Sequence, residues 1–232
     1  MNNYKYEVQS GRSMIEMLGV LAIIGVLSVG GIAGYSKAMN KFKTNKVADN
    51  VAMIVTNIRT LYAQQKDYNG LNNYSAVQMG VVPDELVSTT DDSKKEQTLI
   101  NAFLGNVEIK AANAKGLDAT STGTDKAFTV KFSGLSKEAC VTLATNDWGS
   151  GYSAGFIGMA VAGTNGGALD SGLDSNCTGS AAAKEEKTGD KVTKVGKATT
   201  ACAGVAMTVV TAATACGCGR ASNTCEILWK YY

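Results

Sequence analysis

Histidine is absent from the 232-residue chain, and proline occurs only once. Without histidine the chain cannot form a Ser-His-Asp triad, a Cys-His pair, a histidine metal site or a histidine-ligated haem. A strong charge of either sign is also lacking, because 22 Lys and Arg residues nearly balance 20 Asp and Glu residues. This composition offers no large basic surface, so no specific nucleic-acid partner is expected. We predict a protein that is not an enzyme and needs no cofactor.

Cysteine is missing from the first 139 residues of the chain. The six cysteines that follow are Cys140, Cys177, Cys202, Cys216, Cys218 and Cys225. They indicate disulfides formed in an oxidising compartment, and six cysteines allow many pairings. A zinc site would use the last four cysteines, but the C-x-x-C spacing of zinc ribbons and dithiol redox sites does not occur. We therefore expect disulfides and no metal.

A long apolar run lies near the N-terminus. Between Met14 and Gly34 the only charged residue is Glu16. About 20 apolar residues in a helix match the thickness of the hydrocarbon core of a bilayer, so the run predicts a transmembrane segment. A carboxylate costs roughly 2.5–3.5 kcal/mol at mid-membrane and less near the edge. We therefore expect Glu16 to meet a partner from the end of its own chain or from another molecule.

A secretory signal peptide and an uncleaved signal anchor are two simpler interpretations of this run. Residues 1–11 contain one Lys and one Glu, which is less basic than the n-region of a signal peptide. The run is also long for a signal core, and residues 30–34 offer only a loose cleavage site. Neither interpretation accounts for a single Glu placed so soon after Gly11.

Residues 11–16, Gly-Arg-Ser-Met-Ile-Glu, and the apolar run behind them resemble the cleavage and assembly motif of type IV prepilins. That family has a short polar leader ending in Gly, a glutamate four residues past the new N-terminus, an apolar helix containing Gly, and a Tyr soon after. The residues at those places here are Gly11, Glu16, Gly25 and Tyr35. The likeness covers only about 25 residues, but it is specific because its four features must coincide.

This resemblance implies how the N-terminus is processed and used. Prepilin peptidase would cut between Gly11 and Arg12, remove residues 1–11 as a leader, and leave Arg12 to be N-methylated. Subunits would wait in the bacterial inner membrane, surrounded by lipid, until an inner-membrane assembly platform stacks them into an extracellular homo-oligomeric helical filament. Glu16 would pair with the free amine of a neighbour's Arg12 in the fibre core and so fix the register. The guanidinium of Arg12 offers a competing partner within the same subunit.

The run departs from many type IV pilins in two respects. Arg12 stands where these pilins more often have Phe or Met, and Ala33 stands where many have a proline. The missing proline resembles the type IVb branch, including the thin-pilus subunits of conjugative plasmids. Gly30, Gly31 and Gly34 cluster at this point. Because glycine weakens a helix by roughly 1 kcal/mol relative to alanine, the cluster predicts a place where the helix bends or locally melts.

Helical periodicity continues beyond the apolar run. The apolar positions are Tyr35, Met39, Phe42, Val47, Val51, Ile54, Ile58, Leu61 and Tyr62. Their spacing of mostly three or four residues is that of one helix face. We therefore predict one long helix over residues 12–66, with residues 14–34 as its transmembrane and assembly part. Residues 67–232 would form an extracytoplasmic body.

Shorter elements are expected along the body. Helical segments are predicted at 73–79, 83–86, 91–104 and, capped by Ser136, from there to Asn146; strands are predicted at 106–110, 127–132, 153–162 and 224–232. Residues 163–200 would form an exposed variable loop, and residues 201–215 fit a helix or a strand. The predicted class is α+β: a long N-terminal helix, half transmembrane and half amphipathic, packed on an antiparallel sheet of about four strands with a disulfide-stapled C-terminal region. The resemblance implies a bridge from Cys140 to Cys216 or Cys218.

Three functions remain open at this point. The first is a structural subunit of a type IV pilus, and the second is a minor pilin or a type II secretion pseudopilin. The third is a membrane-anchored binding domain or enzyme, suggested by Asp147 and Trp148 beside the glycines at 149 and 151. That stretch lacks the third glycine and the strand-before, helix-after context of a nucleotide site, so a glycine-rich turn is the simpler interpretation.

Overall fold

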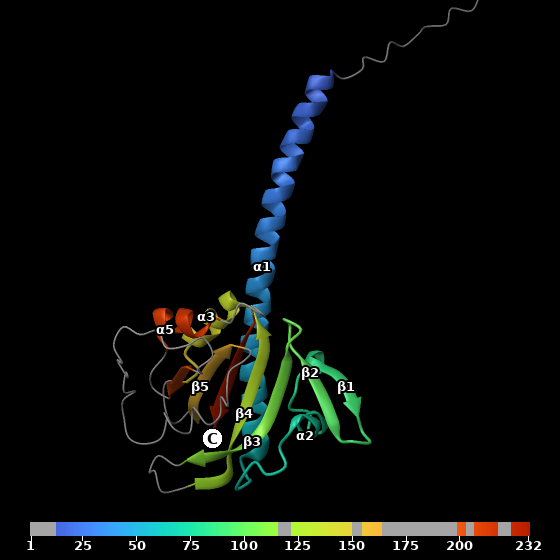
Figure 1. The fold of residues 1–232 in the computed structure, drawn as a ribbon. Coiled ribbons are helices and arrows are strands. Elements are labelled where there is room, and N and C mark those ends of the chain that lie inside the picture. The colour runs from blue at the N-terminus through green and yellow to red at the C-terminus, as the bar shows by residue number, and fades with distance from the viewer. Residues whose placement is uncertain (1–12, 116–121, 150–154, 164–198, 203–206, 218–223) are drawn as a thin grey trace, which may run out of the picture. The chain divides into compact units, whose positions relative to one another are not determined.

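The computed structural model describes residues 13–115, 122–149, 155–163, 199–202, 207–217 and 224–232. The chain divides into two compact units, residues 1–42 and residues 43–232. Helix α1 (Met14–Tyr62) supplies the described part of the first unit and the first element of the second. Figure 1 shows α1 in blue, followed by the strands and short helices of the second unit, which we call the body.

In the first unit α1 is an uninterrupted α-helix. Ser13 starts it, because its carbonyl oxygen accepts hydrogen bonds from the N–H groups of Glu16 (3.0 Å) and Met17 (3.2 Å). The hydroxyl groups of Ser28 and Ser36 donate to the carbonyl oxygens four residues earlier, at 2.8 and 3.0 Å. These bonds satisfy the serines within the helix, so the segment presents few unpaired polar groups to an apolar surrounding.

In the body the same helix buries one apolar face. Val47, Val51, Ile54 and Ile58 are fully buried in the core. The helix ends at Tyr62, four residues before the predicted end. Residues 63–66 are exposed, so they have no apolar face to pack, and packing supplies most of the stability of a helix in a protein.

The short helices form where the sequence provides caps. They are α2 (Asn73–Gln78), the 3₁₀ turn η1 (Asp84–Leu86), α3 (Lys137–Thr145) and α5 (Val209–Ala215). Asn72 and Ser75 form a capping box at α2, and Ser136 caps α3 through the N–H of Ala139 at 3.2 Å. These elements confirm the helices predicted at 73–79, 83–86 and 136–146. They also show that residues 209–215, within the ambiguous stretch, are helical.

One antiparallel sheet of seven strands forms the rest of the body, in the order β1-β2-β3-β4-β7-β5-β6. The strands are β1 (Val87–Asp91), β2 (Glu96–Ile100), β3 (Asn106–Lys115), β4 (Thr122–Leu135), β5 (Phe156–Gly163), β6 (Thr199–Cys202) and β7 (Cys225–Tyr231). The C-terminal strand β7 pairs with β4 and β5 and so lies inside the sheet. The α+β class is confirmed, with more strands than the four predicted.

The helix predicted at 91–104 is wrong. Residues 87–100 instead form a hairpin of β1 and β2, which join at a turn where Asp91 Oδ1 accepts from the N–H groups of Ser93 and Lys94. Gln97 and Leu99 are buried while residues 96 and 98 are exposed, which is the alternation of a strand with one buried face. The apolar residues in this stretch resembled a helix face because their spacing alone does not separate the two structures.

The core fills one face of the sheet. Phe128, Val130 and Phe132 of β4 and Ile227 and Trp229 of β7 belong to the same buried cluster as the α1 face. The ring of Trp229 packs edge-on against that of Phe132, with the ring centroids 5.9 Å apart. A disulfide joins Cys140 of α3 to Cys216 at the end of α5, which confirms one of the two bridges that the prepilin resemblance implied.

Candidate assembly site

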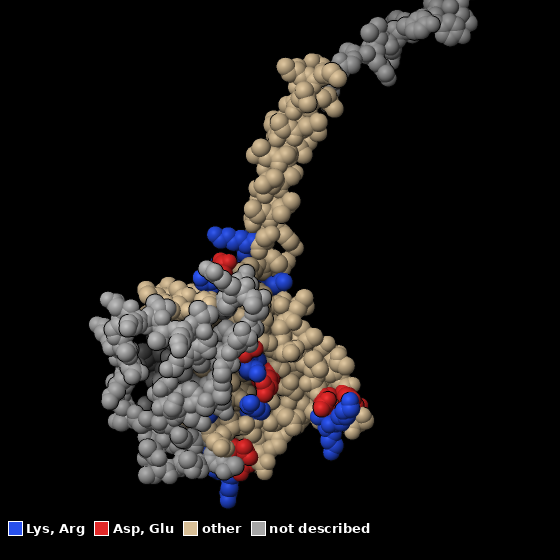
Figure 2. Space-filling model, viewed as in Figure 1, with Lys and Arg blue, Asp and Glu red and all other residues tan. Residues whose placement is uncertain are grey.

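The first unit is an apolar rod without an internal partner. Residues 13–38 are all exposed, and the large apolar side chains among them range from 44% exposed at Val20 to 87% at Met14. The most apolar 18-residue window has a mean hydropathy of 2.2, and the helix is long enough to cross a membrane. Figure 2 shows this stretch as an almost uncharged surface. Soluble monomers rarely expose an apolar surface this large, so lipid or other protein must cover it.

Glu16 is the acidic residue in the first turn of this rod, and its side chain is exposed. A carboxylate is favoured there, because the N-terminal end of a helix carries a partial positive charge. Gly11 and Arg12 lie outside the described residues, so the predicted cleavage site and the pairing of Arg12 with Glu16 stay predictions.

Gly30, Gly31 and Gly34 lie within the continuous helix. A Cβ atom built at any of the three would meet nothing within 4 Å. No contact inside the described chain therefore requires glycine at these positions. The predicted bend or melting at this cluster stays a prediction about the packed fibre.

The described cysteine sulfurs gather at one place in the body. Those of Cys140, Cys216 and Cys225 are buried and lie within 4.8 Å of one another. Cys140 and Cys216 are bonded to each other, and Cys225 is disulfide-bonded as well. Because a metal binds the thiolate form, Cys216 cannot serve the four-cysteine zinc site considered above. Cys177 and Cys218 lie outside the described residues, as does the side chain of Cys202.

The stretch beginning at Asp147 is a turn that follows α3. The N–H of Gly149 donates to Asp147 Oδ1 at 3.0 Å. Trp148 Nε1 donates to the carbonyl oxygen of Leu143 at 2.8 Å, and its ring packs on Trp229 with a centroid separation of 5.0 Å. The tryptophan therefore anchors the turn to the core, as the simpler interpretation expected. Residues 150–152 lie outside the described residues.

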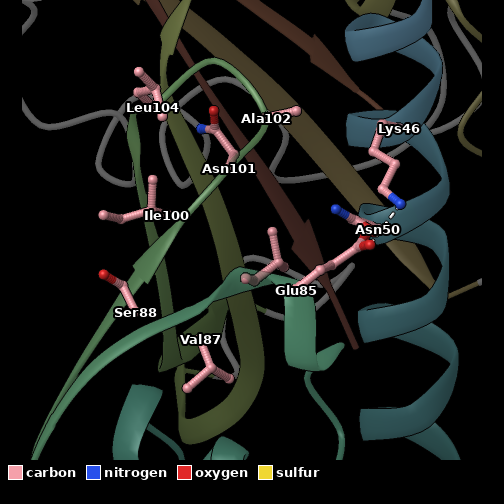
Figure 3. Close-up of a pocket in the computed structure, with 10 residues that line it drawn as sticks. Lys46, Asn50, Glu85, Val87, Ser88, Ile100, Asn101, Ala102 and Leu104 are labelled. Carbon is pink, nitrogen blue, oxygen red and sulfur yellow. Dashed lines mark ion pairs between the residues drawn. The ribbon is translucent and has the colours of Figure 1, made fainter.

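A second surface, which sequence reasoning missed, lies beside α1 in the body. We call it the body pocket: a hollow of about 320 Å³ whose walls come from residues 46–50 of α1, residues 85–88 and residues 100–104. Figure 3 shows Lys46 and Glu85 paired at its edge, with Nζ and Oε2 2.5 Å apart. Asn50 interrupts the apolar face of α1 between Val47 and Ile54. That interruption was the signal in the sequence that marked this surface.

Three comparisons place the chain among known proteins. The sequence model of the Bundlin family matches residues 36–195. The chain belongs to the Bundlin family. This match begins after residues 11–16, so Bundlin membership is independent of the prepilin-like motif.

Two Bundlin-like relatives come from Escherichia coli. The major structural subunit of bundle-forming pilus from strain O127:H6 (E2348/69 / EPEC) is 31% identical over 166 residues, covering 70% of this chain and 76% of the relative. Its counterpart from O111:H- is 30% identical over 151 residues, covering 64% and 69%. The crystal structure of a type IV b pilin from Salmonella typhi is 16% identical, has a TM-score of 0.48, and covers 79% of this chain and 95% of that one. Bundlin membership confirms the type IV pilin family predicted from the N-terminus.

Proposed function

We propose that this chain is a structural subunit of a type IV pilus, built into a homo-oligomeric filament through the apolar half of α1. The observation that carries the proposal is the exposed rod with its single carboxylate, Glu16, on a chain of the Bundlin family. Bundling these rods in a fibre core removes their apolar surface from water. The two relatives are named as major subunits of a pilus, which favours a major subunit over a minor pilin or pseudopilin. Pilin subunits are not enzymes.

The pathway to the filament follows from the same proposal. The subunit enters the bacterial inner membrane with residues 14–34 in the lipid and residues 67–232 outside the cytoplasm. Prepilin peptidase removes residues 1–11, Arg12 becomes the N-methylated first residue, and an inner-membrane platform adds the subunit to an extracellular pilus. Mass spectrometry of sheared fibres should therefore recover Arg12, methylated on its amine, as the N-terminus. Recovery of Met1, or of an N-terminus near Gly34, would contradict this processing.

Glu16 is expected to set the register of neighbouring subunits. In a low-dielectric core, removing one partner of an ion pair costs about 3–5 kcal/mol, because the other charge, here the amine of a neighbour's Arg12, is left unpaired. Glu16→Ala should therefore leave cleavage intact, because the body and the leader are unchanged, but abolish filaments in sheared preparations. Asp49→Ala is the matched control, since it removes another exposed acid of α1 and should assemble normally. Normal filament yield from Glu16→Ala would refute the register role.

A further inference from the structure

The Cys140–Cys216 bridge passes over other cysteines of the chain. Two of them, Cys177 and Cys202, lie between its ends in the sequence. Cys177 follows Cys140 by 37 residues, whereas Cys216 follows it by 76. Cys216 also has a nearer neighbour in Cys225, nine residues beyond it. Both ends of the observed bridge therefore have closer cysteines with which to pair.

Loop length and chain order both favour the nearer cysteine while the body is unfolded. For a flexible chain, closing a loop of twice the length is about threefold less probable. An exported chain also emerges from its N-terminal end, so Cys177 reaches the oxidising compartment before Cys216 does. Two thiols that meet there are joined by the oxidants of that compartment. First oxidation therefore favours a bridge from Cys140 to Cys177 over the bridge in the structure.

The observed pairing depends on two folded helices instead. Cys140 lies in α3 and Cys216 at the end of α5, and these helices pack on one another. Helix α5 is held by its cap, where Thr208 Oγ1 accepts from the N–H of Thr211 at 3.3 Å, and by the buried Ala212. The packing brings the Cα atoms of the two cysteines to 5.9 Å, within the limit of about 7 Å for a disulfide. The bridge therefore requires contacts that exist only after α3 and α5 have folded.

Burial limits the time in which a wrong bridge can be corrected. The side chains of Cys140, Cys216 and Cys225 are all fully buried in the main core cluster. Thiol–disulfide exchange requires that the attacking thiolate reach a sulfur of the bridge. Once the core has closed, a thiol from solution reaches none of these three sulfurs. Correction must therefore take place while the body is still open.

The fold also gathers a competing sulfur at the bridge. The sulfurs of Cys140, Cys216 and Cys225 lie within 4.8 Å of one another. Strand β7 places Cys225 there, because Cys225 pairs with Leu135 of β4, just before α3 begins. Proximity alone therefore does not select Cys216 over Cys225 as the partner of Cys140. Pairing by first contact would give mixed bridges, whereas reversible exchange selects the most stable one.

We propose that the Cys140–Cys216 bridge is reached by disulfide isomerisation, and that the exported chain is a substrate of a dithiol disulfide isomerase. A thiolate of this partner attacks the Cys140 sulfur of an early bridge to Cys177, which forms a mixed disulfide and releases the Cys177 thiolate. The Cys216 thiolate then attacks the same Cys140 sulfur, which forms the final bridge and restores the thiolate of the isomerase.

This exchange consumes no oxidant or reductant. One disulfide is broken and one is formed at each step, and Cys177 ends as the free thiol in place of Cys216. The proton that Cys216 loses is balanced by the proton that Cys177 takes up. The inference rests on the proposed function, because it requires that the body be exported.

Peptide mapping of the full-length chain tests the dependence on the isomerase. The chain is expressed in two matched bacterial strains, with and without their periplasmic dithiol isomerase; free thiols are alkylated at once, and bridged peptides are identified by mass spectrometry without reduction. With the isomerase, Cys140 should be joined to Cys216. Without it, the fraction of this bridge should fall about threefold or more, and a bridge from Cys140 to Cys177 should replace it. Equal fractions in the two strains would overturn the proposal.

A variant that keeps only Cys140 and Cys216 is the matched control. Its four substitutions are Cys177→Ser, Cys202→Ser, Cys218→Ser and Cys225→Ala. Because no wrong partner remains, the bridge should form to the same extent in both strains. A continued loss of the bridge without the isomerase would overturn the proposal.

Refolding the reduced wild-type chain makes the same comparison without any substitution. In detergent and a glutathione buffer, purified isomerase should raise the rate at which the Cys140–Cys216 bridge forms about threefold or more. An unchanged rate would overturn the proposal.

Failure of the proposed function gives a different result. The mapping uses the membrane-inserted subunit and needs no filaments, so correctly bridged wild-type chains that form no filaments would refute the pilus subunit alone. A chain whose cysteines all stay reduced in the cytoplasm would refute export and this inference with it.

Discussion

Gly105 lies directly against the backbone of β4, just before β3 begins. A Cβ atom at this position would lie 1.8 Å from the carbonyl oxygen of Ser133 in β4. Gly134 has a φ of +74°, and a Cβ atom built on it would lie 2.7 Å from the Cα atom of Gly105. The glycine pair therefore lets the backbones touch and also sets the loop that holds Asn101.

Gly105→Ala should destabilise the body, because the added methyl group forces the two strands apart. We expect the free energy of unfolding to fall by about 2–3 kcal/mol, in the range of overpacked cores. Chemical unfolding of the full-length chain in detergent, followed by circular dichroism, measures the change.

Gly80→Ala provides the comparison for this prediction. Gly80 has a φ of +69°, but a Cβ atom there would meet nothing within 4 Å. Alanine should therefore incur only the backbone penalty of a left-handed residue, about 1 kcal/mol. A loss at Gly105 no larger than the loss at Gly80 would show that the strands tolerate the extra methyl group.

At the scale of elements, the parts predicted correctly are those whose signals are contiguous in the sequence. The continuation of α1 beyond the apolar run follows from its apolar face, and α3 follows from the cap at Ser136. Strands β3 and β4 alternate apolar and polar residues over five positions, and β7 is rich in apolar and aromatic residues. The exposed apolar part of α1, residues 14–34, was predicted for the same reason, because Glu16 and the apolar run lie together in one short stretch.

Elements that depend on distant partners were not predicted. Strand β2 is defined by its pairing with β1 and β3, since its own residues carry apolar spacing that also fits a helix. Helix α5 runs against the preference of its valines and exists because tertiary contacts hold it. The body pocket has walls from three separate segments, so no local pattern outlines it. Only Asn50, a polar residue within an apolar helix face, pointed to it.

The bridge between α3 and α5 is the tertiary contact most open to test. Its two cysteines are 76 residues apart, and closing a long loop restricts the unfolded chain. Cys140→Ala together with Cys216→Ala should lower the free energy of unfolding by about 2–4 kcal/mol. Limited proteolysis should then cut near α5 first, because that helix loses its anchor.

Ser136→Ala is the control for this double variant, since it weakens the cap of α3 by about 1 kcal/mol and leaves the bridge in place. Full stability of the double variant would mean that packing alone fixes α5.

At the scale of the whole body, a column of aromatic rings joins α1 to the centre of the sheet. Tyr62 contacts Tyr68, Tyr68 contacts Phe128, and Phe128 contacts Tyr231, with centroids 5.1, 4.8 and 5.9 Å apart. Tyr231 then meets Phe156 at 5.2 Å. These rings belong to segments far apart in the sequence, so they are brought together only when the body folds as one piece.

Burial gives this column a dependence on pH. It raises the pKa of Tyr231, Tyr68 and Tyr62 above the ordinary value of 10.0, although the charge of Arg59 partly offsets the effect at Tyr231 and Tyr68. A tyrosine is neutral while it holds its proton. Above a pH of about 10 the unfolded chain therefore loses protons that the folded body keeps, so the unfolded state is favoured. Stability is complete below that pH and should fall as the pH rises through it.

Tyr231→Phe should weaken this fall. The phenol of Tyr231 is nearly buried and makes one long hydrogen bond, 3.5 Å to the carbonyl oxygen of Trp148, so phenylalanine should fold well at neutral pH. Removing one linked proton should reduce the slope of unfolding free energy between pH 10 and 11 by up to about 1.4 kcal/mol per pH unit. Urea unfolding of the full-length chain in detergent, at pH values of about 8, 9, 10 and 11, measures the slope. Tyr35→Phe, at an exposed site outside the body, should leave the slope unchanged. Equal slopes for Tyr231→Phe and the native chain would mean that this phenol ionises without unfolding the column.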